Sequence, residues 1–202
     1  SDLPEYLGIR PRFVGGTQVG GCSFILHVEL AMAAISAGLC DVALITHGES
    51  GYSRIAMPAP RWGDDSTNTQ FELVHGSVGP PTGYGFLTTR HMHEYGTTKE
   101  QMAEVAVATR KWAALNPRAF ARDPISVADV LTSRLIAWPF NLLDCCLVTD
   151  AGGACVVTSA ERARDLPKPP VYVLGTGECT THQMVSQMPS FNRWDAAVAS
   201  GQ

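Results

Sequence analysis

The segment that most constrains the fold lies within the first fifty residues. Residues 20–23 read Gly-Gly-Cys-Ser, and residues 24–37 are apolar on nearly every face of a helix. A helix without a clean polar face is usually buried. Gly38 can take the left-handed conformation that ends a helix, and residues 41–46 run apolar without alternation, as strands covered on both faces do. With a β-prone run at residues 12–19, this order predicts a strand, a helix and a strand joined as a right-handed parallel crossover.

The first turn of that helix is the strongest candidate for chemistry. Amide N–H groups at a helix N-terminus lack intrahelical partners, and the helix dipole is positive there. A thiolate on Cys22, or an oxyanion held by the amides of Gly21, Cys22 and Ser23, would be stabilised at this point. Two interpretations of Cys22 remain open: a nucleophile, or a small packed side chain beside Gly20 and Gly21.

Composition excludes several classes of function. The chain has 202 residues, 45% of them hydrophobic, and a formal net charge of -4 without long charged runs. Nucleic-acid binding needs a basic face, so nucleic acid is not an expected partner. No apolar run approaches the roughly 20 residues that span a bilayer, and the first residues lack a signal-peptide pattern. The six cysteines form no CxxC pair, which favours reduced thiols, a cytoplasmic location and no structural zinc.

The rest of the chain alternates helix and strand patterns around one long excursion. Residues 49–85 hold several prolines and glycines and are expected to be irregular. The other patterns predict helices at 98–115, 126–136 and 160–166, and strands at 154–157 and 171–174. About four good strands and one apolar helix are too few layers for a complete sheet domain.

Polar residues near the predicted sheet are the next candidates. His47 and Glu49 follow a buried strand directly, and carboxyl ends of parallel strands face ligands. His27 is more simply a satisfied core residue than a base. His91 and His93 could share a metal, but no third ligand is placed, so no metal site is predicted.

Four motifs in order resemble the thiolase superfamily, nearest to sterol-carrier-protein thiolases and lipid-transfer-protein aldolases. They are VGGCSFILHVELAMAAISAGLCDVALITHGES, EYGTTKEQMAEVA, DAGGACVVTSAERARDL and VYVLGTGE, spread over about residues 12–185. The resemblance implies an α/β fold: part of a five-layer αβαβα sandwich with a mixed, mostly parallel sheet and an inserted loop domain. It assigns residues 1–48 to the β-α-β with the active-site helix, 49–140 to the loop domain, 141–166 to the end of the N-terminal half and 167–202 to the start of the C-terminal half.

Two positions depart from the family pattern. The family's nucleophilic cysteine falls on Gly21, so Cys22 is one residue late and turned by about 100° on the helix. In the loop domain, Glu94 stands where the family often has a histidine near the pantetheine. Both departures suit a branch that has lost the nucleophile.

The resemblance implies an acyl-CoA-processing enzyme, a thiolase-like acyltransferase, that makes or breaks a C–C bond next to a thioester. The implied catalytic residues are Cys22, Gly21 and Ser23, and the implied substrate-binding residues are Gly20, His47, Glu49 and Glu94. Alternatives are a retro-aldol lyase acting on β-hydroxyacyl-CoA, and a non-catalytic acyl-CoA or lipid-binding subunit. No cofactor is implied beyond coenzyme A as part of the substrate. The implied partners are a second copy of the chain in a homodimer and an OB-fold, zinc-ribbon protein.

Overall fold

In the computed structural model, which describes residues 3–17, 19–54 and 66–202, the chain divides into two units. Unit 1 comprises Ser1–Ala56, Thr149–Thr181 and Asp195–Gln202, and unit 2 comprises Met57–Val148 and His182–Trp194. The elements of unit 1 are α1 (Leu3–Tyr6), α2 (Ser23–Ser36), β1 (Val42–Ser50), β4 (Asp150–Thr158), α7 (Ala160–Arg164) and α8 (Asp195–Ser200). Those of unit 2 are α3 (Thr67–Phe71), η1 (Leu73–His75), α4 (Pro80–Tyr95), α5 (Lys99–Leu115), α6 (Val127–Thr132), β2 (Leu135–Ala137), β3 (Phe140–Asn141), η2 (Leu142–Asp144) and η3 (Val185–Gln187).

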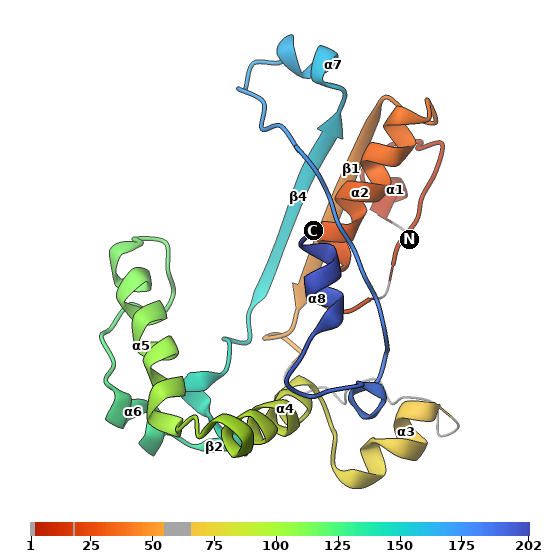
Figure 1. Cartoon of the computed structure of the whole chain (residues 1–202). Coiled ribbons are helices and arrows are strands. Elements are labelled where there is room, and N and C mark those ends of the chain that lie inside the picture. The colour runs from red at the N-terminus through yellow and green to blue at the C-terminus, as the bar shows by residue number, and fades with distance from the viewer. Residues whose placement is uncertain (1–2, 18, 55–65) are drawn as a thin grey trace. The chain divides into compact units, whose positions relative to one another are not determined.

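Unit 1 is built on a long antiparallel pair of strands. β1 pairs with β4 along its whole length, from Val42 opposite Thr158 to Ser50 opposite Asp150. Helix α2 packs along β1 and also contacts β4 (Figure 1). Gly38 follows α2 with φ +69°, so the predicted glycine stop is confirmed.

The expected mostly parallel sheet is not what the described residues form. Both two-stranded sheets, β1–β4 and β2–β3, are antiparallel, and the described part of residues 12–19 contains no strand. The parallel crossover prediction is therefore wrong here, because the strand that precedes α2 is absent from the ladder. Thr17 is bound to His27 of α2 instead.

Helix α2 is also less covered than its sequence predicts. Ala31 is its one buried residue among those described, while Ile25 is 63% and Leu30 50% exposed. A two-stranded sheet offers little area, so it covers only one side of an all-apolar helix.

Unit 2 is mainly helical and holds a small core of its own. Ala103 and Val107 of α5 meet Val130 of α6, and Ala103 and Val130 are fully buried. The capping boxes predicted at Thr98 and Ser126 are both confirmed. Helix α6 ends at Thr132, earlier than expected, because the chain turns into β2.

The expectation of an irregular segment at 49–85 is wrong for its second half. Helix α4 begins at Pro80 and runs to Tyr95. Proline is suited to the first turn of a helix, where its missing N–H costs nothing, so the two prolines start a helix rather than prevent one. Residues 55–65 of the predicted excursion lie outside the described residues.

Two further strand predictions need correction. β4 begins at Asp150, four residues before the predicted strand at 154–157. Residues 171–174 form no strand, and Val171 and Leu174 are almost fully exposed. These residues have β-prone side chains but no neighbouring strand with which to pair.

Candidate functional site

The turn before α2 is held by its own polar groups. Gly20 has φ +85°, a left-handed conformation that favours glycine. The Ser23 hydroxyl donates to the Gly20 carbonyl oxygen (2.8 Å) and accepts from the Val19 N–H (3.0 Å). Cys22 is the N-cap residue and is exposed, with Sγ 3.5 Å from the Val19 carbonyl oxygen. This turn therefore presents the Cys22 thiol at the surface of unit 1.

The amides of this turn are only partly occupied. The Ser23 N–H donates to the Gly20 oxygen (3.1 Å), and the Ile25 N–H donates to the Cys22 oxygen (3.0 Å). Within the described part of the chain, the N–H groups of Cys22 and Phe24 have no acceptor. The Gly21 N–H likewise has no acceptor among the described residues, whereas the Ser23 N–H, the third predicted donor, is already used. Free amides at a helix N-terminus favour an oxyanion, so the N–H groups of Gly21, Cys22 and Phe24 are the available donors.

The structure brings His47 to the same helix start. The His47 ring lies against the Phe24 ring, with centroids 5.2 Å apart and planes tilted by 36°. Because side chains alternate along a strand, His47 and Glu49 share the β1 face of the buried Ile45. Of the two predicted substrate-binding residues on β1, His47 is thus the one that contacts the first turn of α2 within the described part of the chain.

His27 lies about one turn after the start of α2, and its Nε2 already has hydrogen-bond partners. The Thr17 N–H donates to its Nε2 (3.2 Å), and the Thr17 hydroxyl lies 3.0 Å from the same nitrogen. The ring fastens the chain before the turn to the helix after it, as expected of a satisfied structural histidine.

Asp150 is the first residue of β4 and was not among the predicted site residues. Its carboxylate accepts from the Ser53 N–H (3.0 Å) and from the Ser53 hydroxyl. These hydrogen bonds lower the pKa of Asp150. Asp150 therefore ties the residues that follow His47 and Glu49 to the start of β4.

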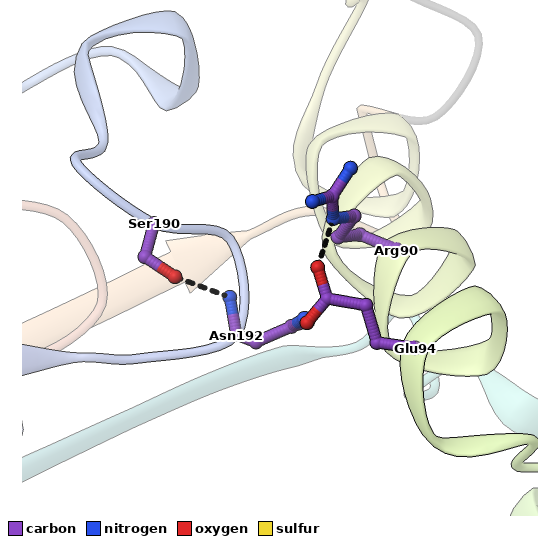
Figure 2. A network of polar contacts seen from close by, with 4 residues as sticks. All are labelled: Arg90, Glu94, Ser190 and Asn192. Atoms are coloured by element: carbon purple, nitrogen blue, oxygen red, sulfur yellow. Dashed lines mark hydrogen bonds and ion pairs between the residues drawn. The ribbon is translucent and has the colours of Figure 1, made fainter.

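Glu94 belongs to unit 2 and lies near the end of α4. Figure 2 shows its carboxylate facing Arg90, one turn earlier on the same helix, with Asn192 beside it. Arg90 Nε and Asn192 Nδ2 both donate to this carboxylate. The pKa of Glu94 is lowered, first by the Arg90 hydrogen bond and then by Asn192.

An open groove of about 830 Å³ runs along α4 within unit 2. Its lining combines basic and aromatic side chains: His75, Phe86, Arg90, His93, Trp138 and Phe191. Among the described residues, the lining includes no carboxylate, and Glu94 is not part of it. Such a surface suits an anionic ligand that also carries apolar or ring-shaped parts.

Sequence reasoning missed this groove because it missed the helix. Thr82, Phe86, Arg90 and His93 recur at three- and four-residue intervals, which is one face of a helix that starts at Pro80. The signal was present, and the double proline concealed it.

The paired histidines do not act together. His91 Nδ1 lies 3.0 Å from the Thr97 hydroxyl, whereas His93 lines the groove. Among residues 3–17, 19–54 and 66–202, no group of three potential metal ligands is found. The same residues contain no helix long and apolar enough to cross a membrane.

Comparison with known proteins gives relatives of two kinds. No family model matches the chain. A steroid side-chain-cleaving aldolase of Thermomonospora curvata is 37% identical over 174 residues, which are 83% of this chain and 44% of the relative. An acetyl-CoA acetyltransferase of Methanothermobacter thermautotrophicus is 29% identical over 196 residues, which are 97% of this chain and 50% of the relative.

Comparison with solved structures gives a similar protein. A solved Ltp2-ChsH2(DUF35) aldolase superposes with a TM-score of 0.80 at 33% identity, over 94% of this chain and 50% of that one. The chain therefore spans about half the length of the proteins that it matches.

Proposed function

We propose that this chain, which belongs to the thiolase superfamily, is part of an acyl-CoA-processing enzyme that cleaves a C–C bond next to a thioester by retro-aldol chemistry. In this reaction a base removes the proton of a β-hydroxyl group, and the C–C bond breaks to give a carbonyl compound and a thioester enolate. The enolate carbon then takes up a proton, which yields the shorter acyl-CoA. Such a reaction needs donors for the enolate oxygen but no nucleophilic thiol.

The observation that carries the proposal is the start of α2. The position of the family's nucleophile is Gly21, which has no side chain, while the neighbouring amides of Cys22 and Phe24 are free of acceptors within the described part of the chain. We assign the oxyanion site to this turn, with Gly20 and Gly21 allowing close approach of the thioester. His47, against Phe24, is the candidate base, because imidazole is the most frequent general base in enzymes.

The groove of unit 2 supports an acyl-CoA substrate. Arg90, His75 and His93 offer donors for phosphate or carbonyl oxygens, and the aromatic side chains offer ring faces. We keep the predicted roles of Glu49 and Glu94 in substrate binding as part of the proposal, Glu94 acting through Arg90.

A thiolase-type acyl transfer is the second candidate. Cys22 is exposed at the helix N-terminus, and the acetyltransferase relative aligns with 97% of the chain. In that reaction the Cys22 thiolate attacks the thioester carbonyl, coenzyme A leaves as a thiol, and the acyl group remains on sulfur.

One pair of measurements separates the two reactions. The protein is incubated with a β-hydroxyacyl-CoA, and release of the carbonyl product is followed beside intact-mass analysis of the protein. Carbonyl release that persists in Cys22→Ser, without an acyl adduct, supports the retro-aldol reaction. An acyl adduct on Cys22 that is lost in Cys22→Ser supports the thiolase, and Cys179→Ser, which removes another exposed thiol, is the matched control. Binding of the acyl-CoA with neither carbonyl release nor an acyl adduct would support a non-catalytic acyl-CoA-binding subunit.

Fold context and partners belong to the same proposal. We infer that the two units are part of a five-layer αβαβα sandwich, because exposed apolar residues such as Ile25, Leu30 and Val156 need a covering layer. The description of the solved aldolase names a second component, ChsH2(DUF35), in keeping with the proposed OB-fold, zinc-ribbon partner. Light scattering of the purified chain, alone and with such a partner, tests this and the proposed homodimer.

A further inference from the structure

We propose that Glu94 is a positioning residue that joins the two walls of the unit 2 groove and sets its width. On one side it holds Arg90 of α4, and on the other it holds Asn192, the neighbour of the groove-lining Phe191 (Figure 2). The inference rests on the proposed function in one respect, namely that coenzyme A is the probe for the groove.

The Arg90 side of this bridge leaves the guanidinium ready for a ligand. Glu94 is bound through Nε alone, and in the described part of the chain no other partner of Arg90 occurs. Both terminal amino groups therefore remain available, and they form the planar fork that matches phosphate and carboxylate oxygens. Glu94 orients this fork without taking its binding face.

The Asn192 side has no substitute for Glu94. The Asn192 Nδ2 donates to the carboxylate, while its Oδ1 is buried without a partner among the described residues. Loss of Glu94 would remove the acceptor of Nδ2 while the buried Oδ1 stays unsatisfied, which is unfavourable for this half-buried amide. Asn192 and Phe191 would then leave their present place.

Other contacts hold the segment 182–194 on both sides of residues 189–193. At its end, the Trp194 ring lies 6.1 Å from the Tyr84 ring of α4. The Ser186 N–H donates to the buried Glu72 carboxylate (2.7 Å), and Val185 lies against Gly83 of α4. None of these contacts involves Glu94. A change at Glu94 should therefore free residues 189–193 and leave residues 185–187 in place.

The test variants are chosen by how many side-chain oxygens at position 94 can accept hydrogen bonds. Glutamine has one side-chain oxygen, so Glu94→Gln cannot accept from Arg90 and Asn192 as the carboxylate does. Asn192→Ala removes one arm and keeps the Arg90 pair. Glu104→Gln removes an exposed carboxylate from the neighbouring helix α5 and is the matched control.

The test combines hydrogen exchange with titration of coenzyme A, using the whole chain and far-UV circular dichroism to check folding. In Glu94→Gln we expect faster exchange at residues 189–193, unchanged exchange at 185–187, and affinity for coenzyme A about tenfold weaker. In the double variant with Asn192→Ala we expect no further loss beyond about twofold, since both changes break the same link.

Three outcomes overturn the proposal: unchanged exchange at 189–193 in Glu94→Gln, unchanged affinity despite faster exchange, or additive losses in the double variant. If the unaltered chain does not bind coenzyme A, the proposed substrate is wrong. The exchange measurement then still decides the role of Glu94: acceleration confined to 189–193 supports it, and no acceleration refutes it.

Discussion

Substitution of two glycines in α4 gives a sharp test of how this helix meets the groove. Gly83 and Gly85 are both buried in the helix interior, where alanine is favoured over glycine by roughly 1 kcal/mol. A Cβ at Gly83 would lie 3.4 Å from the Val185 side chain, an ordinary contact. A Cβ at Gly85 would lie 2.4 Å from the Trp138 carbonyl oxygen, which belongs to the main chain.

The two substitutions should therefore have opposite signs. Relief of the Gly85→Ala overlap requires α4 and the main chain at Trp138 to separate, and overpacking of this kind costs about 1–3 kcal/mol. Gly83→Ala has only the gain in helix propensity and should raise the free energy of unfolding by up to ~1 kcal/mol. In Gly85→Ala the same gain offsets part of the overpacking cost, so the free energy of unfolding should fall by up to ~2 kcal/mol. Because Trp138 lines the groove, Gly85→Ala should also weaken coenzyme A binding.

Urea unfolding followed by circular dichroism measures both free energies, with unchanged m-values as the sign that the unfolded states are comparable. Coenzyme A titration of the same samples gives the second readout. A Gly85→Ala protein as stable as Gly83→Ala would refute the close approach of α4 to Trp138.

Three other perturbations follow from the structure. Val130→Ala removes two methyl groups from a fully buried site and should destabilise unit 2 by about 2 kcal/mol in urea unfolding, whereas a loss under ~0.5 kcal/mol would contradict this core. Glu72→Ala leaves the Ser186 N–H without its acceptor and should cost about 1–3 kcal/mol, with faster exchange at that amide; unchanged exchange would disprove the contact. The pKa of Asp150 is lowered by the Ser53 hydrogen bonds, so its contribution to stability is present at neutral pH and is lost as pH falls through the lowered folded pKa. Between pH 2 and pH 7, the free energy of unfolding should therefore fall less with decreasing pH in Asp150→Asn than in the unaltered chain. The same pH dependence in both proteins would count against the Ser53 contact.

Local signals in the sequence determined local structure well. Thr98 with Gln101 and Ser126 with Asp129 predicted two helix starts, and both capping boxes are present. Gly38 predicted the end of α2, and it has the left-handed φ that this role requires. These features depend on residues three or four positions apart, so a single sequence contains all the information.

The candidate site was accessible from the sequence only in part. The turn at Gly20 and Cys22 was identified because its residues are contiguous, and its proposed roles remain predictions. The groove was missed, since it needs Phe86 and Arg90 from α4, Trp138 after β2 and Phe191 from a distant segment. No local pattern connects these positions.

What the sequence by itself determined is therefore several of the helices, two of their capping boxes and the resemblance to the thiolase superfamily. Tertiary structure alone decided that β1 pairs antiparallel with β4 across more than ninety intervening residues, and that Glu94 faces Asn192 rather than the groove. The physical reason is the range of the interactions. Caps and turns are satisfied within a few residues, whereas strand partners and groove walls are chosen by whichever distant segment completes the hydrogen bonds and covers the apolar surface.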